Sequence, residues 1–321
     1  MENKKKVLVT GAAGFIGHHL VRYLKDKGYW VRGVDIKEPE YSSKSEADEF
    51  LILDLRFLEN CLKATEDIEE VYALAANMGG IGFITFHNAD VLYDNVCINA
   101  NTAEATKKNG VKRLFYSSSA CIYPTFKQKD ANVVALKESD AYPADPDNEY
   151  GWEKLFSERL YKSYSQFFET RIARFHNIFG PEGTYDGGKE KAPAALCRKI
   201  ALVKDGSEIE IWGDGEQTRS FCYVDDCVEG VYNLMRSDFR EPLNIGSDRL
   251  ISMNEMAEVI AKIAGKKISK KHQLDKPQGV RGRNSDNTLC KKVLNWEPKI
   301  SLDQGLKNTY EWINKQIGVQ E

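Results

Sequence analysis

The most constraining feature of the chain is a short run of β-branched and apolar residues that leads directly into a glycine-rich loop. Residues 6–10 read KVLVT, and GAAGFIG follows at positions 11–17. An amphipathic stretch, residues 18–27, comes next. A glycine motif gains meaning when it joins a strand to a helix. We therefore predict a strand, a tight loop and a helix, the unit that begins a doubly wound parallel sheet.

The three glycines of this loop have the spacing of a dinucleotide-binding site. Gly11 permits the tight turn, Gly14 lets the backbone approach a pyrophosphate at the helix N-terminus, and Gly17 allows the helix to pack closely on the sheet. Phe15 and Ile16 lie between Gly14 and Gly17 and are assigned to the same site. The segment predicts a bound dinucleotide cofactor.

Carboxylates follow the second and third predicted strands. Residues 30–34 are strand-like and end in Asp35, 18 residues past Gly17. A carboxylate there accepts both ribose hydroxyls and repels a 2′-phosphate, so NAD is favoured over NADP. The alternative for Asp35 is that it only caps a turn. A third strand, residues 50–54, ends in Asp54, which we predict to reach the adenine.

Strand-like runs alternate with helical patterns through the first half of the chain. Further strands are expected at 71–76, 111–116 and 171–175, and helices at 90–108 and 150–167. This alternation predicts an α/β fold, a Rossmann-type doubly wound parallel sheet in residues 1–175. From His176 the chain is richer in loops. We predict a smaller, interleaved C-terminal substrate-binding domain in residues 176–321, with some segments returning to the first domain.

Composition and targeting signals narrow the class of protein. The 321 residues carry a net charge of −3, which argues against a general nucleic-acid partner. No apolar run reaches membrane-spanning length, and the first strand leaves no room for a signal peptide, so we expect no membrane partner and a cytoplasmic location. The seven cysteines lack CxxC or paired Cys/His spacing, so we expect no metal site and no disulfide framework.

Two polar motifs in the first half predict a reactive site. SSSACIYP, residues 117–124, follows a predicted strand, at the end where ligands lie in open α/β sheets. Tyr150 and Lys154 form a YxxxK pair on one helix face. A nearby cation favours the phenolate, so Lys154 is expected to lower the pKa of Tyr150, with Ser119 bonding the same reacting oxygen. A solvated helix pair is the alternative for a lone YxxxK.

Together, GAAGFIG, SSSA, YxxxK and RFHNIFGP (174–181) resemble the extended short-chain dehydrogenase/reductase family of sugar-nucleotide enzymes. The resemblance covers essentially the whole chain. Within the family, several long segments are similar to the group of GDP-mannose 3,5-epimerases. These segments are SSACIYP, GGKEKAPAALCRK (187–199), WGDGEQTRSF (212–221), FREPLNIGS (239–247) and GVRGRNSDN (279–287). The resemblance implies NAD as cofactor, a GDP-hexose substrate, an isomerase reaction at C3 and C5, and a homodimer.

The resemblance also implies a role for each matching residue. Tyr150, Lys154 and Ser119 would be the redox set, and Cys121 and Lys191 the base and acid of epimerisation. A transient ketone at C4 makes the protons at C3 and C5 acidic, and Lys191 and the nicotinamide charge are expected to stabilise a Cys121 thiolate. The residues implied to bind the substrate are Gly79, Ser119, Cys121, Asn177, Glu190, Lys191, Ala192, Lys199, Gln217, Thr218, Arg219 and Arg283. From sequence alone, two alternatives stay open: Lys191 could be an ordinary solvent-exposed lysine, and Arg219 and Arg283 could form structural ion pairs.

Three other readings share these motifs. GDP-fucose synthases carry the same cysteine and epimerise C3 and C5, but they use NADPH, with a basic residue where this chain has Asp35 and a histidine where it has Lys191. Other sugar-nucleotide 4-epimerases and 4,6-dehydratases share the fold, but dehydratases carry Asp-Glu in place of Ala120-Cys121. A non-catalytic NAD-sensing regulator is the alternative outside enzymes. Such proteins generally lack the tyrosine or the lysine, and both are present here.

Overall fold

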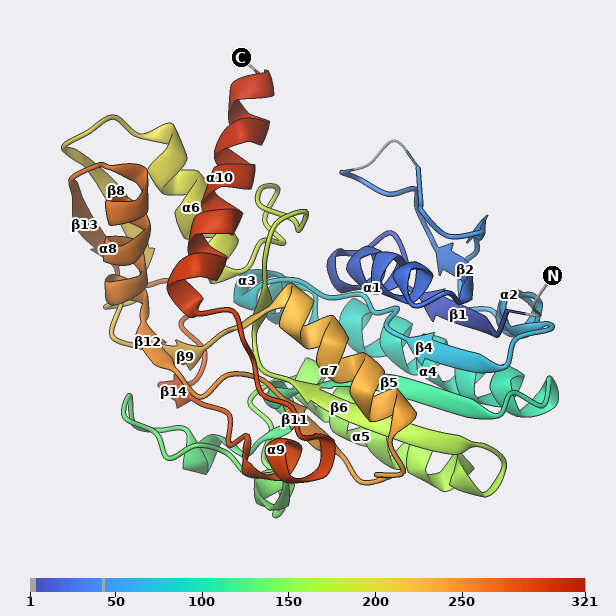
Figure 1. Cartoon of the computed structure of the whole chain (residues 1–321). Coiled ribbons are helices and arrows are strands. Elements are labelled where there is room, and N and C mark those ends of the chain that lie inside the picture. The colour runs from blue at the N-terminus through green and yellow to red at the C-terminus, as the bar shows by residue number, and fades with distance from the viewer. Residues whose placement is uncertain (1–3, 42–43, 321) are drawn as a thin grey trace.

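A parallel sheet of seven strands forms the centre of residues 4–41 and 44–320, the part of the chain that the computed structural model describes (Figure 1). Its strand order is β11-β6-β5-β4-β1-β2-β3. The strands are β1 (Lys6–Thr10), β2 (Trp30–Asp35), β3 (Glu49–Ile52), β4 (Glu70–Ala73), β5 (Arg113–Ser119), β6 (Glu169–Phe175) and β11 (Leu243–Ile245). Every pairing within it is parallel. The predicted Rossmann-type sheet is confirmed.

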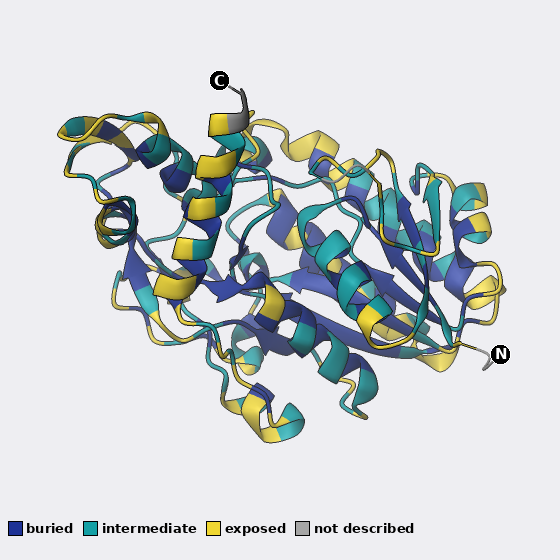
Figure 2. Cartoon of the chain, turned by 45° about the horizontal axis from the view of Figure 1, so that its top comes forward, coloured by how far each residue is buried: buried dark blue, intermediate teal, exposed yellow. Residues whose placement is uncertain are grey.

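Helices bury both faces of this sheet, whose strands are dark blue in Figure 2. Side chains alternate between faces along each strand, so Val7 and Val9 join one core cluster and Leu8 the other. The helices α1 (Phe15–Asp26) and α7 (Val224–Arg236) supply the first cluster. The second includes residues of α2 (Leu58–Thr65), α4 (Asn88–Lys108) and α5 (Glu149–Ser163). Each fully buried aliphatic side chain contributes about 1.5–3 kcal/mol to folding.

Smaller sheets and further helices complete the described chain. The helices are α3 (Ile81–Phe86), α6 (Ala192–Leu202), α8 (Met253–Ala264), α9 (Thr288–Leu294) and α10 (Leu302–Gln320). Short 3₁₀ turns occupy Ala120–Ile122, Thr125–Lys127, Glu138–Ala141 and Tyr164–Gln166. The paired strands are β7 (Ile178–Phe179) with β10 (Cys222–Tyr223), β8 (Ser207–Trp212) with β13 (Ile268–Gln273), and β9 (Thr218–Ser220) with β12 (Leu250–Ser252) and β14 (Gly282–Arg283).

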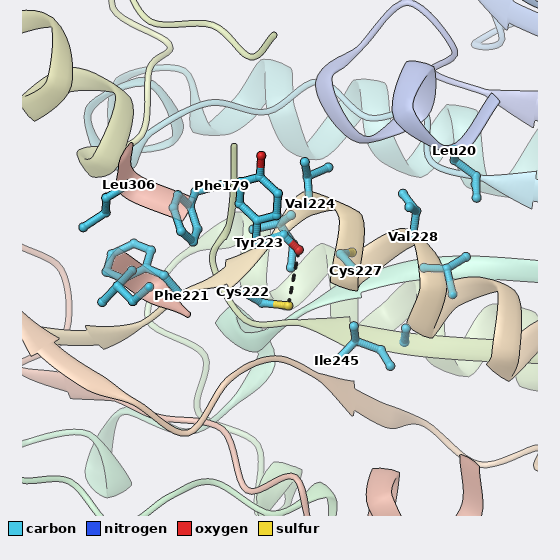
Figure 3. Packing of buried hydrophobic residues seen from close by; sticks show 14 of the residues in the cluster. Leu20, Phe179, Phe221, Cys222, Tyr223, Val224, Cys227, Val228, Ile245 and Leu306 are labelled. Atoms are coloured by element: carbon cyan, nitrogen blue, oxygen red, sulfur yellow. Dashed lines mark hydrogen bonds between the residues drawn. The ribbon is translucent and has the colours of Figure 1, made fainter. Parts of the chain in front are cut away.

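The core of the second half is continuous with that of the first. Figure 3 shows Phe179 and Tyr223 close to the start of α7, with Leu306 beyond Phe179, while Val228 of α7 lies toward Leu20 of α1. The strand β11 returns to the large sheet and pairs with β6. Because one hydrophobic cluster contains residues of both halves, residues 1–175 and 176–321 pack against each other. The domain boundary at residue 175 stays a prediction.

The parallel arrangement brings several loops to one edge of the large sheet. The carboxyl ends of parallel strands meet at the same edge, so the chain segments after β1, β2, β5 and β6 lie close together there. These are the segments that hold the glycine loop, Asp35, Cys121 and Asn177. Among helices in the described part of the chain, none combines the length and apolar character that a membrane crossing requires.

Candidate active site

The glycine loop between β1 and α1 is shaped to receive a diphosphate. Gly14 is the N-cap of α1 and no side chain caps this helix end, so the amides of its first turn, which include Phe15 and Ile16, face outward. A Cβ at Gly17 would lie 1.9 Å from the carbonyl oxygen of Gly11, so only glycine allows this close packing. Uncapped amides at a helix N-terminus bind anions. The loop therefore fits a dinucleotide.

The two predicted cofactor carboxylates have partners within the protein. The Oδ2 of Asp35 accepts from the backbone N–H of Ala13 at 3.0 Å, and its Oδ1 accepts from Ile36 at 2.7 Å. Asp35 thus ties the glycine loop to the end of β2 and also caps its own turn. Asp54 is paired with Arg56, whose hydrogen bonds lower the pKa of Asp54. Its contact with adenine stays a prediction.

The serines and the cysteine of SSSACIYP lie at the carboxyl end of β5. Ser117 and Ser119 are within the strand and pair with β6, where the sequence suggested the start of a loop. Cys121 follows in a 3₁₀ turn, and its backbone N–H donates to Ser119 Oγ at 3.2 Å. This bond fixes the hydroxyl and the thiol on one short segment.

Helix α5 packs directly against this segment. Its N-cap, Asn148, accepts a hydrogen bond from Gly151 at 2.9 Å. A Cβ at Gly151 would lie 2.3 Å from the carbonyl oxygen of Cys121, so the glycine allows the first turn of α5 to contact the Cys121 backbone. Tyr150 is brought next to Ser119 and Cys121 as a result. Sequence reasoning missed Gly151, although a glycine directly after a candidate catalytic tyrosine is a readable signal.

Tyr150 and Lys154 are both buried, and their electrostatics differ from the expectation. The Nζ of Lys154 donates to the carbonyl oxygen of Ser117 at 3.0 Å and lies 5.6 Å from the Tyr150 ring centroid. Burial raises the pKa of Tyr150, with further increases from Cys121 and Glu153, and the hydrogen bond with Ser119 opposes them. Burial lowers the pKa of Lys154. The predicted lowering of the Tyr150 pKa was wrong, because burial of the phenol disfavours the charged phenolate.

Two arginines on neighbouring strands lie near the thiol, and Arg283 contacts it. β14 runs parallel to β9 with Arg283 beside Arg219. The Nη1 of Arg283 donates to Cys121 Sγ at 3.1 Å. Burial, with the charge of Arg283, lowers the pKa of Arg219 to about 9. Burial also lowers the pKa of Lys191, and the charge of Cys121 opposes that shift. The sulfur thus lies among cations.

Other predicted substrate residues surround this cluster. The Nδ2 of Asn177 donates to the carbonyl oxygen of Ser220 at 2.9 Å. Thr218 is bonded through its backbone to Arg281. The Nε2 of Gln217 donates to Trp212 O at 2.9 Å, while its buried Oε1 has no hydrogen-bond partner in the described residues. A buried acceptor of this kind calls for a donor, which a ligand would supply.

Residues of α6 and of the loop before it extend away from the thiol. Lys191 is the N-cap of α6 and Ala192 is its first residue. Lys199 donates to the carbonyl oxygen of Glu210 at 2.8 Å and lies about 12 Å along the helix from Lys191, outside the cluster around Cys121. Glu190 accepts from the backbone of Gly188 at 2.7 Å.

Gly79 belongs to the loop that leads into α3 and approaches the segment that carries Lys191. The neighbouring Gly80 donates to the carbonyl oxygen of Lys189 at 3.0 Å. A Cβ at Gly79 would lie 2.8 Å from the side chain of Phe83, and Lys189 lies over the ring of Phe83. The structure therefore brings the Gly79 loop and the Lys191 loop together, as a shared substrate site requires.

Comparison with known proteins identifies the family of this chain. Residues 7–246 match the model of the NAD dependent epimerase/dehydratase family, a range that includes residues of every strand of the large sheet. The chain belongs to this family. Within the NAD dependent epimerase/dehydratase family, it is 53% identical over 315 residues to the GDP-mannose 3,5-epimerase of Arabidopsis thaliana, covering 97% of this chain and 83% of that protein.

More distant family members share the fold. The GDP-L-fucose synthase of Sinorhizobium fredii is 30% identical and is matched over 96% of this chain and 95% of its own length. The UDP-glucose 4-epimerase of Thermotoga maritima, solved with UDP-glucose, has a TM-score of 0.88 at 26% identity and covers 97% of this chain and 99% of that one. In this chain Arg283 also contacts Gln128 through a hydrogen bond and Asp147 through an ion pair. Sequence reasoning did not single out either residue.

Proposed function

We propose that this chain is an NAD-dependent isomerase that inverts C3 and C5 of GDP-mannose, giving GDP-L-galactose, through a transient ketone at C4. The observation that carries the proposal is the position of Cys121. Its thiol is bonded to Arg283 at 3.1 Å and shares a site with Tyr150 and Lys191. The 53% identity to a GDP-mannose 3,5-epimerase supports the choice of substrate.

The redox half of the reaction uses residues at the end of β5 and on α5. Gly11, Gly14, Phe15, Ile16, Gly17 and Asp35 would hold the dinucleotide. Bound NAD supplies the hydride acceptor for C4 and returns the hydride at the end of each turnover. Tyr150 takes the proton of the C4 hydroxyl, with Ser119 bonded to the same oxygen. The Nζ of Lys154 lies 5.6 Å from the Tyr150 ring centroid, on the same helix.

The epimerisation half uses a base and an acid on opposite faces of the sugar. With a ketone at C4, loss of the proton from C3 or C5 gives an enolate. Cys121 as thiolate removes that proton and becomes a thiol, and the Lys191 ammonium then protonates the other face and becomes an amine. Exchange with solvent returns both groups to their starting forms before the second centre reacts. A gulose-type product follows if one centre is left unchanged.

The polar residues around the thiol would hold the nucleotide sugar. Asn177, Gln217, Arg219 and Arg283 lie on the short strands and loops beside the cluster, and Lys199 lies about 12 Å further along α6. A guanidinium binds a diphosphate through two parallel hydrogen bonds, which suits the two arginines. The unpartnered Oε1 of Gln217 supports a ligand at this position. Gly79 would line the hexose.

The test is incubation of the enzyme with GDP-mannose in D₂O. We expect deuterium at C3 and C5 and protium at C4, because the carbon-bound protons of the first two positions exchange through the thiol and the amine. Proton NMR of the product measures each position and identifies the sugar. Turnover without exchange at C3 and C5 would refute the mechanism.

Other outcomes of the same experiment identify the alternatives. With NADPH and a GDP-4-ketohexose added to the incubation, stoichiometric oxidation of NADPH with a reduced product would indicate a GDP-fucose synthase, an alternative that the 30% identity to such an enzyme supports. Asp35 and the lack of any histidine between Asn177 and Arg219 weigh against it. Tight binding of NAD with no turnover of any nucleotide sugar would indicate an NAD-sensing regulator.

We infer that the enzyme is a homodimer that associates through α4 and α5. These two helices pack side by side on one face of the sheet. Their outer sides carry exposed aromatic residues, Tyr93 on α4 and Trp152 and Phe156 on α5. Trp152 and Phe156 are one helical turn apart and share a face. Exposed aromatic side chains grouped on neighbouring helices are typical of a protein interface.

Phe156→Glu is expected to convert the dimer to a monomer. Each interface would lose two buried phenyl rings and gain two charges, so the dissociation constant should rise at least about 100-fold. Light scattering coupled to size-exclusion chromatography measures the mass. Leu274→Glu is the matched control, because Leu274 is also exposed but lies after β13, away from α4 and α5. An unchanged dimer in Phe156→Glu would show that the interface does not involve this face of α4 and α5.

We also infer a cytoplasmic location. The seven cysteines are all free thiols in the structure, five of them buried. Unpaired cysteines in this number fit a reducing compartment. The nucleotide-sugar substrate and the expected cofactor are consistent with that placement.

A further inference from the structure

The guanidinium of Arg283 is held on the sulfur of Cys121 by a side chain that the reaction itself does not require. The Nε of Arg283 donates to Gln128 Oε1 at 2.5 Å, while its Nη1 donates to Cys121 Sγ at 3.1 Å. Arg283 is 5% exposed and Gln128 is 1% exposed, so both contacts are shielded from solvent. Charge-assisted hydrogen bonds of this kind are among the strong ones in proteins.

Gln128 has no freedom to turn away from Arg283. Its Nε2 donates to the carbonyl oxygens of Tyr123 at 2.9 Å and Pro124 at 3.2 Å, which fixes the orientation of the amide and leaves Oε1 for the guanidinium. The backbone carbonyl of Gln128 also accepts from the N–H groups of Arg281 at 3.0 Å and Gly282 at 3.2 Å. One residue thus holds the strand that carries Arg283 and the side chain of Arg283 itself.

Close approach of this strand depends on Gly282. A Cβ there would lie 2.1 Å from the carbonyl oxygen of Asp130, so a larger residue would displace β14. The segment that follows Cys121 and the strand that carries Arg283 are therefore built to meet. The contact joins residues 162 positions apart in the sequence.

Other titratable groups also face the thiol. Lys154 and Tyr150 approach it from α5, Lys191 from the start of α6, and Arg219 from β9. Asp147 lies on the far side of Arg283, with its Oδ2 3.6 Å from Nη2. Burial alone would lower the pKa of Arg283, but the charges of Cys121 and Asp147 outweigh it and raise the pKa. Of the four cations, Arg283 has a hydrogen bond to the sulfur.

We propose that Arg283 is the counter-cation that stabilises the Cys121 thiolate, and that Gln128 is the positioning residue that aims it. The proposal rests on the proposed function, in which Cys121 is the base, and it assigns to Arg283 a role beyond binding the diphosphate. The Nη2 of Arg283 makes no hydrogen bond in the described residues and faces Asp147 at 3.6 Å, while Nη1 stays on the sulfur.

The test measures how the reactivity of the thiol depends on pH in the full-length protein without substrate. Iodoacetamide is the probe, and mass spectrometry of the Cys121 peptide gives its alkylation rate. In Arg283→Gln we expect the midpoint of the pH profile to rise by at least about one unit, a tenfold loss of rate below the midpoint, since a charged hydrogen bond to the thiolate is lost. Arg283→Lys should restore part of the shift.

Gln128→Met keeps the volume of the side chain and removes its hydrogen bonds, so its midpoint should lie between those of the wild type and Arg283→Gln. Arg281→Gln is the matched control, because Arg281 pairs with Asp214 and should leave the midpoint unchanged. Cys97, partly exposed on α4, is the internal reference for reagent reactivity, and continued protection of the five buried thiols reports that the variant is folded.

An unchanged midpoint in folded Arg283→Gln would overturn the proposal. If Arg283→Gln does not fold, an unchanged midpoint in folded Gln128→Met would overturn it. The readout needs neither GDP-mannose nor turnover. A failure here therefore differs from a failure of the proposed function, which would appear as no exchange of C3 and C5 protons by the wild type in D₂O.

Discussion

Cys121→Ser is expected to lower the rate of deuterium incorporation at C3 and C5 of GDP-mannose by about 10²- to 10⁴-fold, the range that a positioned general base supplies. A serine hydroxyl occupies the same place but does not ionise near neutral pH, so the base is lost while the shape is kept. Oxidation at C4 does not involve the thiol. The variant should therefore still form a small, transient amount of NADH, which absorbance measures, while NMR measures the exchange.

The control for this substitution is Cys97→Ser. Cys97 is a free, partly exposed thiol on α4 and has no place in the proposed chemistry. Its variant should exchange both positions at the wild-type rate. Full exchange by Cys121→Ser would remove the thiol from the role of base and would point to Lys191 as the group that works on both faces.

Much of the fold follows from local sequence patterns. The strands expected from residue 6 to residue 175 are all present, since short apolar runs between helical segments are what a parallel sheet buried on both faces requires. The strand β13 is different. It pairs with β8 through backbone hydrogen bonds, but its residues Lys270 and Lys271 carry no apolar alternation that would have predicted it. Pairing of this kind depends on a distant partner rather than on local pattern.

The candidate site also has some parts that follow from local sequence and others that depend on distant segments. The glycine loop and the pair of Tyr150 and Lys154 each lie within one short segment, so their spacing predicts their geometry. The contact of Arg283 with Cys121 was not predictable in this way, because it depends on packing between segments far apart in the chain. The prediction that the pKa of Tyr150 is lowered was also wrong. Burial of the phenol by Ile84 and Val91 raises that pKa, and this burial is a property of the packed structure.

Tyr150→Phe is expected to abolish both halves of the reaction. The phenol is the acceptor of the C4 hydroxyl proton, and without it the ketone that acidifies C3 and C5 is not formed. We expect transient NADH and deuterium exchange to fall together by about 10²- to 10⁴-fold, in contrast to Cys121→Ser, where only exchange is lost. Absorbance and NMR on the same samples separate the two patterns.

The fold should tolerate Tyr150→Phe, because the ring packs against Ile84 and Val91 and the hydroxyl bonds only with Ser119 among the contacts described. Tyr164→Phe is the matched control. Tyr164 lies in the turn after α5 and its hydroxyl donates to Glu104 of α4, so its loss should leave both rates unchanged. NAD affinity, measured by calorimetry, should be similar in all three proteins. Exchange at C3 and C5 that persists in Tyr150→Phe without any NADH would mean that the carbon acids are activated without a C4 ketone, and the order of steps proposed for Tyr150 and Cys121 would have to be abandoned.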